Sequence, residues 1–509
     1  MLARLNSVTL IGIDGKVCEV EVHISKGGSD RSMIVGLPDA AVKESSERVH
    51  SSIINSGYQY PNTQIVVNLA PADIKKEGPA FDLPIAIGVL AANGSITCEN
   101  LKKEVMVGEL ALDGRIRPVN GVLSMAASAR DAGFERIIVP LENAPEAAVV
   151  QGIKVYGAGT LASVIGFLSQ QLELEETVVD LDRLFDVSRT YDIDFSDVKG
   201  QESVKRALTI AAAGGHNVLM IGPPGSGKTM LSKRINTILP PLSLAESLET
   251  TRIYSSVGML DRSHALLAKR PFRSPHHSAS APALIGGGTN PRPGELSLAH
   301  HGILFLDEFP EFPRNVLETI RQPLEDGTVT IARAKNTLTF PAQFMLIASA
   351  NPCPCGYHGS TIRQCKCTQR QVDKYMSKIS GPLLDRIDIH IDVPAVNYQK
   401  LRDKRNGYTS AEIRQQVIRA RDLQAQRFGN SKLMTNAHMS HKQIEKFCGL
   451  DAMGESMLKN AMTELALSAR AHDKICKVAR TIADLEGFEN VQPEHISEAI
   501  SYRKLDRKL

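Results

Sequence analysis

A strand–loop–helix pattern at Val218–Met230 constrains the fold of this 509-residue chain more than any other stretch. Four apolar residues, Val218–Ile221, run directly into the sequence GPPGSGKT. This is the P-loop pattern, in which glycines let the backbone wrap a phosphate and a helix N-terminus points at the anion. The complete pattern and its flanks disfavour an ordinary Gly/Pro turn. We expect the triphosphate of a nucleotide to be held by Gly222, Pro223, Pro224, Gly225, Ser226, Gly227, Lys228 and Thr229.

Within this loop, Lys228 is expected to reach the β- and γ-phosphates, and the Thr229 hydroxyl to bind Mg²⁺. Downstream, the apolar stretch of Gly302–Phe309 (GILFLDEF) ends in Asp307 and Glu308. An Asp-Glu pair after a buried strand is weak evidence of function by itself, but after a complete P-loop it indicates the second half of an ATPase site. Asp307 would hold Mg²⁺ through its water shell, and Glu308 would orient and polarise the attacking water.

Length and composition limit the number of domains and the classes of partner and location that fit this chain. The length predicts two to four domains. With 59 basic and 56 acidic residues the formal charge is only +3, so any surface for nucleic acid must be local. The N-terminus lacks the pattern of a signal peptide. The longest apolar run, Leu83–Ala92, is shorter than the ~20 residues that span a bilayer and predicts a core helix. Eight cysteines without secretion signals predict a reducing, cytoplasmic location and no membrane contact.

Residues 1–170 are expected to form a compact mixed α/β domain. The patterns predict strands at Val17–Ile24, Gln64–Ala70 and Arg136–Pro140, helices at Asp39–Asn55, Asp82–Ala92 and Val122–Ala132, and a hairpin over Val105–Val119.

Two segments of this region, Lys75–Ala92 and Val107–Pro140, resemble the proteolytic domain of Lon proteases. The resemblance implies the ribosomal S5 domain 2-like α+β fold. Lon-type peptidases pair a serine that follows Gly-Pro with a lysine in the second segment, but these positions are Ala80 and Leu123 here. Alanine offers no nucleophile and leucine takes no proton. The domain is therefore expected to be proteolytically inactive and to support assembly or partner contacts.

The central region, residues 198–395, resembles the AAA+ ATPases and is expected to follow an acidic linker at residues 171–197. In this resemblance, Phe195–Glu202 corresponds to the adenine-contact segment and Asn351, after the strand Phe344–Asn351, to sensor 1. Arg386 corresponds to the arginine finger that reaches the γ-phosphate of a neighbouring subunit. A cation supplied in trans implies a ring, which is usually a hexamer in this superfamily.

Residues 396–509 are expected to form the helical lid of the AAA+ core. Arg470 matches the sensor 2 position, and Arg480 is a less favoured candidate with a structural role. Helical spacing predicts helices at Ser410–Arg427, His441–Phe447, Met453–Leu467, Ala471–Leu485 and Pro493–Tyr502.

Two segments go beyond a generic AAA+ core. Arg270–Gly302 is rich in Gly, Pro, Ser and His, and its histidines fit no common metal spacing, so loop or pore residues are favoured over ligands. Thr328–Pro341 alternates about a turn and predicts a hairpin whose tip carries Arg333 and Lys335. This is either a solvated turn or a cationic tip that grips the DNA backbone inside a ring.

Four cysteines immediately after Asn351 form the pattern C-x-C-x₉-C-x-C, and together they suit tetrahedral Zn²⁺. The C-x-C spacing is tighter than usual, which leaves unliganded thiols or transient redox chemistry open, and His358 is a substitute ligand. The remaining cysteines are scattered and expected to be packed. The favoured zinc ligands are Cys353, Cys355, Cys365 and Cys367.

These features resemble the magnesium-chelatase-like branch of AAA+ proteins, and the chain as a whole resembles the ComM/YifB family. The most specific segments are FRSPHHSASAPALIGGG, PGELSLAHHGILFLDEFPEF, NPCPCGYHG and SGPLLDRIDIHI. The resemblance implies an ATP- and Mg²⁺-dependent homo-hexameric DNA helicase that drives branch migration in recombination and natural transformation. The alternatives are a chelatase-type ATPase that remodels a protein or inserts a metal, and an ATP-dependent protease.

Overall fold

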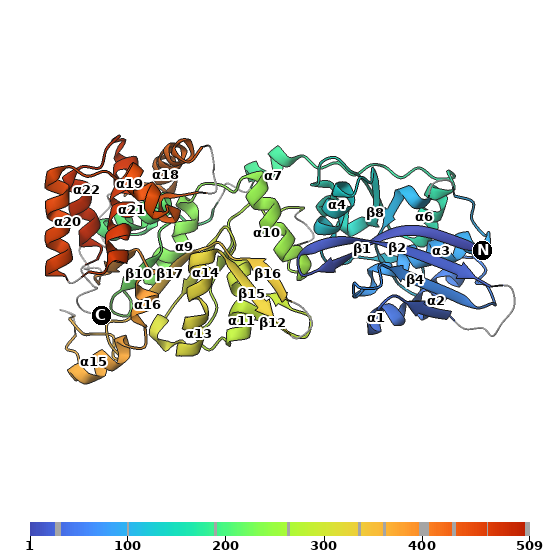
Figure 1. Ribbon diagram of the computed structural model, residues 1–509, viewed down its shortest axis with the longest axis horizontal. Coiled ribbons are helices and arrows are strands. Elements are labelled where there is room, and N and C mark those ends of the chain that lie inside the picture. Colours follow the sequence, from blue (N-terminus) through green and yellow to red (C-terminus); the bar gives the residue numbers. More distant parts are fainter. Residues whose placement is uncertain are drawn as a thin grey trace. The chain divides into compact units, whose positions relative to one another are not determined.

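The computed structural model describes residues 1–25, 32–98, 101–187, 191–261, 265–333, 337–359, 363–395, 407–429, 434–465 and 467–503. The chain separates into two compact units (Figure 1). Unit 1 comprises Met1–Ser188 and Ser243–Ala268, and unit 2 comprises Arg189–Leu242 and Lys269–Leu509. Among the described residues, no helix has the length and apolar character needed to cross a bilayer.

Unit 1 is built on a seven-stranded mixed sheet with the order β3-β4-β2-β1-β5-β8-β9. Its two longest strands, β1 and β2, pair antiparallel from Leu2 opposite His23 to Ile11 opposite Asp14. The strands are β1 (Leu2–Ile11), β2 (Asp14–Ile24), β3 (Ser32–Val35), β4 (Ile65–Ala70), β5 (Glu104–Met106), β8 (Arg136–Pro140) and β9 (Lys154–Ala158).

The helices of unit 1 cover this sheet because their apolar residues face it. The helix α3 is buried along most of its length, as expected for the longest apolar run. The helices are α1 (Ala40–Lys43), α2 (Ser45–Asn55), α3 (Asp82–Asn93), α4 (Val122–Asp131), α5 (Ala144–Ala148), α6 (Leu161–Leu168), α7 (Leu181–Val187) and α10 (Leu244–Ser256).

The mixed α/β class and most predicted elements of unit 1 are confirmed. Four details differ from the predictions. The single helix expected at Asp39–Asn55 is interrupted at Glu44, and the hairpin over Val105–Val119 contracts to β6 (Glu109–Leu110) and β7 (Ile116–Arg117). The helix α7 forms inside the stretch predicted to be a linker. The central strand β1 was not anticipated at all.

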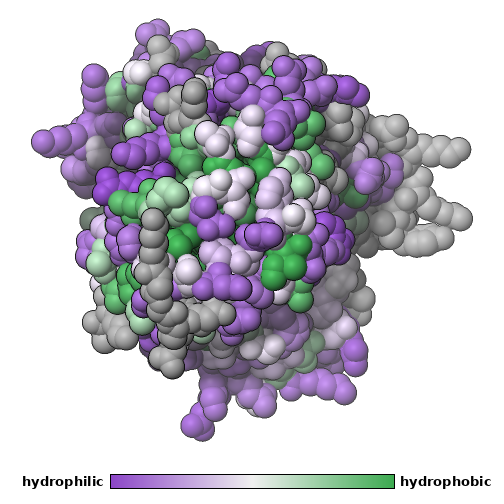
Figure 2. Space-filling view, turned by 90° about the vertical axis from the view of Figure 1, so that its right-hand side faces the viewer, coloured by the Kyte–Doolittle hydropathy of each residue, from purple (hydrophilic) through white to green (hydrophobic). Residues whose placement is uncertain are grey.

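Figure 2 shows one face of unit 1, on which green apolar patches gather near the middle and purple polar residues dominate the margin. Exposed apolar side chains of this unit include Met33, Val35 and Leu37, on and just after the edge strand β3. An edge strand presents unpaired backbone groups to a partner. These features suit the expected role in assembly or partner contacts, which stays a prediction.

Unit 2 contains a five-stranded parallel sheet with the order β11-β14-β17-β10-β18. The central strands are buried on both faces, which explains their uninterrupted apolar sequences. The strands are β10 (Val218–Ile221), β11 (Phe272–Arg273), β14 (Ile303–Leu306), β17 (Met345–Ala350) and β18 (Ile389–Asp392).

Helices flank this sheet, and short strands project from it. The helices are α8 (Glu202–Gly214), α9 (Lys228–Ile238), α11 (Ala281–Ile285), α12 (Glu295–Leu298), α13 (Arg314–Thr319), α14 (Arg321–Asp326), α15 (Gln369–Met376) and α16 (Gly381–Leu384). The short strand pairs are β12 (Gly286–Gly287) with β13 (Arg292–Pro293) and β15 (Thr328–Ala332) with β16 (Thr337–Pro341).

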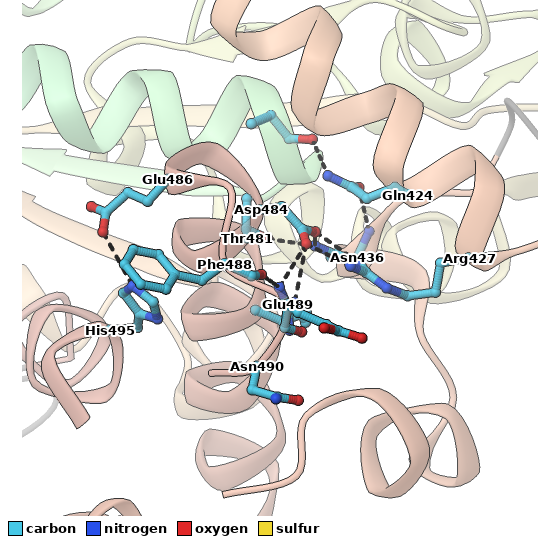
Figure 3. A network of polar contacts seen from close by, with 12 residues as sticks. Gln424, Arg427, Asn436, Thr481, Asp484, Glu486, Phe488, Glu489, Asn490 and His495 are labelled. Carbon is cyan, nitrogen blue, oxygen red and sulfur yellow. Dashed lines mark hydrogen bonds and ion pairs between the residues drawn. The ribbon is translucent and has the colours of Figure 1, made fainter. Parts of the chain in front are cut away.

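The described part of the region expected to form the lid contains the helices α18 (Ser410–Arg427), α19 (His441–Phe447), α20 (Ala452–Glu464), α21 (Ala469–Glu486) and α22 (Pro493–Ser501). Figure 3 shows the polar network inside the lid, where Arg427 forms an ion pair with Asp484 at 2.5 Å. Arg480 donates to Asp484 and to the carbonyls of Phe488 and Glu489. Its guanidinium is therefore used inside the lid, in agreement with a structural role.

Candidate functional site

The P-loop follows the carboxyl end of β10 and opens α9. Gly225 and Gly227 have φ values of +75° and +86°, which side-chain-bearing residues rarely adopt. The Lys228 Nζ donates to the carbonyls of Gly222 (2.7 Å) and Pro223 (3.0 Å) and to Asn351 Oδ1 (3.2 Å). Burial lowers the pKa of Lys228, and the charges of Asp307 and Glu308 oppose that shift. The loop is thus folded with its cation at the phosphate position.

A second pair of side chains lies at the same edge of the sheet. Thr229 Oγ1 donates to Asp307 Oδ2 at 2.8 Å, and the Ser349 hydroxyl donates to Asp307 Oδ1. Thr229 lies in the first turn of α9, Asp307 follows β14 and Ser349 belongs to β17, so a helix and two parallel strands converge here. Hydroxyl and carboxylate oxygens are the donors that Mg²⁺ prefers, and the set fits the expected magnesium position.

Glu308 has a backbone conformation that is unusual for a non-glycine residue, with φ of +52°. Its carboxylate is about half exposed, and Glu308 Oε2 lies 3.1 Å from His277 Nδ1. The two groups form an ion pair when the imidazole is protonated. The residue expected to orient the attacking water is therefore held by a histidine of the segment Arg270–Gly302.

The sequence interpretation placed this histidine in a loop or pore and missed its contact with Glu308. The contact between His277 and Glu308 follows from strand pairing: β11 pairs parallel with β14, with Phe272 opposite Ile303. The residues that follow β11 therefore emerge at the same edge as Asp307 and Glu308. Arg273 anchors the segment through two hydrogen bonds to Glu295, at 2.7 and 2.6 Å.

A glutamine also missed by the sequence interpretation braces the P-loop. Gln201 lies in the segment expected to contact adenine and has φ of +58°. Its Nε2 donates to the carbonyl of Ser226 at 2.8 Å and to that of Pro394 at 3.0 Å. The side chain therefore joins the loop to the chain that follows β18.

Of the three predicted accessory residues, only Asn351 lies at the P-loop of its own chain, through Lys228. The Arg386 guanidinium instead contacts Glu325 Oε1 and the carbonyl of Pro382, each at 2.5 Å. Its Nε is buried without a hydrogen-bond partner among the described residues. Arg470 is exposed at the start of α21.

The four clustered cysteines come together beside the P-loop. The Sγ atom of Cys353 lies 3.4 Å from that of Cys355 and 3.7 Å from that of Cys365, and all four ligand atoms lie within 4.8 Å of one another. Four thiolates bound to one ion at about 2.3 Å would be spaced in this way. Backbone hydrogen bonds from Lys366 and Tyr357 lower the pKa of Cys355 to about 6, which favours its thiolate.

Two further contacts define the surroundings of these thiols. The backbone N–H of His358 donates to Cys353 Sγ at 3.3 Å, whereas its imidazole is outside the group of close ligand atoms. Gly356 approaches the P-loop so closely that a Cβ there would lie 2.6 Å from Pro224 Cδ. The donor set fits zinc, and the segment that carries it packs against the nucleotide loop.

Family models and full-length relatives agree with this geometry. Residues 194–401 match the model for magnesium chelatase, subunit ChlI, residues 20–143 that for subunit ChlI of Mg-chelatase, and residues 407–503 that for the C-terminal part of subunit ChlI. Competence protein ComM of Haemophilus influenzae is 43% identical, with 100% of this chain and 98% of the relative covered. YifB of Salmonella typhimurium is 45% identical over the same shares.

The chain belongs to the ComM/YifB family. It is a magnesium-chelatase-like AAA+ protein, and the family together with the site makes it an ATPase. Lon protease 2 of Bacillus subtilis is 25% identical over 169 residues, in accord with a Lon-like domain.

In this member of the ComM/YifB family, the positions of the Lon-type catalytic pair are apolar and buried. Ala80 and Leu123 belong to the same apolar cluster as Ala265 and Leu266, from the segment that follows the P-loop helix in sequence. The Gly121 N–H, at the start of α4, donates to the carbonyl of Ser255 at 3.1 Å. That the domain lacks peptidase activity stays a prediction.

The hairpin expected in the ATPase core is confirmed: β15 and β16 pair antiparallel, with Thr330 opposite Thr339. Arg333 lies exposed at the end of β15. Lys335 falls outside the described residues, so only one of the two predicted cationic positions is placed.

The contact between His277 and Glu308 generates a direct prediction. His277→Ala should raise the ATP turnover without DNA by up to about fivefold, since releasing the carboxylate removes a surface ion pair of about 0.2–1 kcal/mol that competes with water. Steady-state phosphate release measures this. His276→Ala is the matched control, because His276 Nδ1 contacts Ser278 Oγ and not the carboxylate. A lower turnover for His277→Ala alone would show that the histidine assists Glu308 instead of withholding it.

Proposed function

We propose that this chain is an ATP-driven, homo-hexameric DNA motor, a branch-migration helicase of homologous recombination and natural transformation. The observation that carries the proposal is the contact of Thr229, in the P-loop, with Asp307, in a chain that is similar over its whole length to a competence protein. Competence requires incoming DNA to be processed, and a ring ATPase can supply the mechanical work.

In this proposal the described contacts become catalytic roles. ATP binds at the P-loop, where Lys228 exchanges its loop carbonyls for the β- and γ-phosphates. Bound Mg²⁺ would neutralise developing phosphate charge, and Thr229 and Asp307 are the residues that would hold it. Glu308 orients the attacking water once it leaves His277. Asn351, which already contacts Lys228, orders the γ-phosphate side of the site.

Two arginines would couple hydrolysis to subunit movement. Arg386 contacts Glu325 and not its own P-loop, which suits a residue that serves a neighbouring subunit. Exchange of Glu325 for a γ-phosphate would satisfy the unbonded Nε as well. Arg470, exposed at the first turn of the lid helix α21, would report the nucleotide state of its own subunit.

The hairpin β15–β16 is the candidate DNA contact. It leaves the core just before β17, the strand that leads to Asn351, so hydrolysis and hairpin position are linked through one strand. Exposed cations such as Arg333 bind phosphates without reading sequence, as a motor on arbitrary DNA requires.

The second candidate function is a chelatase-type ATPase that remodels a protein or drives metal insertion. The match of three regions to magnesium chelatase subunit ChlI favours it. The full-length similarity to a competence protein favours the DNA motor instead.

The decisive experiment is an ATP-dependent assay on three- and four-stranded branched DNA, with porphyrin metallation and casein degradation as parallel assays. We expect branch migration by the intact chain and a loss of both ATPase activity and migration in Lys228→Ala, which lacks the phosphate-binding cation. Metallation without migration would favour the chelatase alternative, and migration by Lys228→Ala would overturn the mechanism.

Removal of the hairpin charges tests the DNA contact separately. Arg333→Ala with Lys335→Ala should weaken DNA affinity to a similar extent for unrelated sequences and reduce the slope of log affinity against log salt, because fewer counterions are released. Fluorescence anisotropy at several salt concentrations measures both quantities. The basal ATPase activity serves as the control and should persist. Binding that is unchanged in strength and salt dependence would remove the hairpin from the DNA path.

Metal analysis tests the cysteine cluster. We expect about one zinc per chain, and less than one in Cys365→Ser, because the remaining thiols cannot complete a tetrahedral set. Removal of zinc by a chelator should also reduce ATP affinity, since the segment with Gly356 packs on Pro224 of the P-loop. Cys448→Ser is the matched control, because Cys448 is buried away from the cluster. A protein without metal that keeps normal ATP affinity would contradict the zinc proposal.

A further inference from the structure

We infer that Asp388 is a positioning residue for Arg386 and that it connects the arginine turn to the lid helix α21. The inference rests on the proposed function, in which Arg386 serves a neighbouring subunit. Asp388 follows Arg386 by two residues and is 7% exposed. It lies at the start of β18, where the ATPase core meets the lid.

The carboxylate of Asp388 accepts hydrogen bonds from two parts of unit 2. Oδ1 accepts from Lys474 Nζ, on α21. Oδ2 accepts from His216 Nδ1 and from the backbone N–H of Asn217, each at 3.2 Å, both just before β10. Burial by itself would raise the pKa of Asp388, but the charge of Lys474 and the hydrogen bond from His216 hold it well below its usual range. The group is therefore an anion at the centre of a satisfied cluster.

Asn217 extends this cluster to the arginine turn itself. Its Nδ2 donates to the carbonyl of Arg386 at 3.1 Å, and its Oδ1 accepts from the backbone N–H of Leu346 at 2.8 Å. Its carbonyl accepts from the backbone N–H of Asp388 at 3.0 Å. The backbone of Arg386 is thus fixed to β10 and β17, whereas its guanidinium remains exchangeable.

On the lid side, the cluster continues through further hydrogen bonds. His216 Nε2 lies 2.8 Å from Thr481 Oγ1, and the Thr481 hydroxyl donates to the carbonyl of Lys477 at 2.9 Å. Thr481 accepts in turn from Asn436 Nδ2 at 3.1 Å. Figure 3 shows Thr481 and Asn436 within the lid network around Asp484 and Arg427.

One helix therefore carries both attachments to Asp388 and the expected nucleotide sensor. Lys474 and Thr481 are seven residues apart on α21, which places them two turns apart on one face. Arg470 lies one turn before Lys474. A displacement of α21 on nucleotide binding would act on Asp388 and through it on the Arg386 turn. Nucleotide state in one subunit is thereby linked to the arginine offered to the next.

Subunit mixing separates this role from a defect in the variant's own nucleotide site. Asp388→Asn keeps the side-chain shape but removes the charge that Lys474 and His216 address. We expect turnover to fall by about 10²-fold, the effect of a misplacement of ~1 Å, while the KM for ATP changes less than about threefold. Arg386→Ala should behave alike. Glu308→Gln provides subunits with an intact arginine and no hydrolysis.

Mixing Asp388→Asn with Glu308→Gln should restore ATPase activity above the sum of the two, because the intact arginine then meets the intact P-loop. Arg386→Ala mixed with Glu308→Gln should recover equally, and Asp388→Asn mixed with Arg386→Ala should not. Recovery in the Arg386→Ala mixture without recovery in the Asp388→Asn mixture would overturn the inference alone. Failure of the Arg386→Ala mixture would overturn the arginine in trans, and the inference with it.

Two further variants serve as a matched control and as a replacement for Asp388→Asn. Arg206→Met is the matched control: Arg206 also joins the core to the lid, through Glu498 at 3.1 Å and Glu486 at 2.5 Å, without touching the arginine turn. Its turnover should stay within about twofold of the intact chain. Where Asp388→Asn does not fold by circular dichroism, Asp388→Asn with Lys474→Met replaces it, since that pair leaves no unpaired buried charge. The same mixing outcomes apply.

Discussion

The parallel pairing of β10, β17 and β14 is the constraint on which the nucleotide site depends. Ile221 lies opposite Ala350 and Leu306 opposite Ala348, so all three strands end at one edge. The P-loop, Asn351 and the pair Asp307–Glu308 follow these ends directly, and their side chains meet although more than 120 residues separate Lys228 from Asn351. The apolar residues of the strands thus set the catalytic geometry through register, without contacting a ligand themselves.

Structural elements that depend on residues close in sequence were predicted correctly. The P-loop, the strand before Asp307 and the helices of the lid each depend on neighbours within about ten residues, and the structure confirms them. The roles of His277, Asp388 and Gln201 were not predicted, because they depend on partners 25 to 193 residues away. Their contacts follow from strand order, which the sequence does not display. The resemblance to AAA+ proteins found Arg386 and Arg470 but says nothing of what holds them.

In unit 1, too, contacts between residues far apart in the sequence could not be predicted. The substitutions Ala80 and Leu123 predicted a Lon-like fold without its chemistry, and both positions are indeed apolar and buried. The sequence did not show that Ser243–Ala268, which follows the P-loop helix, joins the same unit and contributes to the same apolar cluster. Arg252, in this segment, donates to Ser124 and Asp14 within the unit. Membership of unit 1 thus depends on contacts between residues far apart in the sequence.

The buried pair of Asp388 and Lys474 is costly to form, because both charges lose their hydration. Apolar residues of similar volume often stabilise a core as well or better, so stability alone does not account for an ion pair here. Directional hydrogen bonds account for the ion pair. The carboxylate orients His216, fixes the start of β18 and, through Asn217, holds the Arg386 carbonyl. An apolar contact would let α21 slide along the core, whereas this polar cluster couples a movement of α21 to the Arg386 turn. The energetic cost is consistent with a site where position matters more than stability.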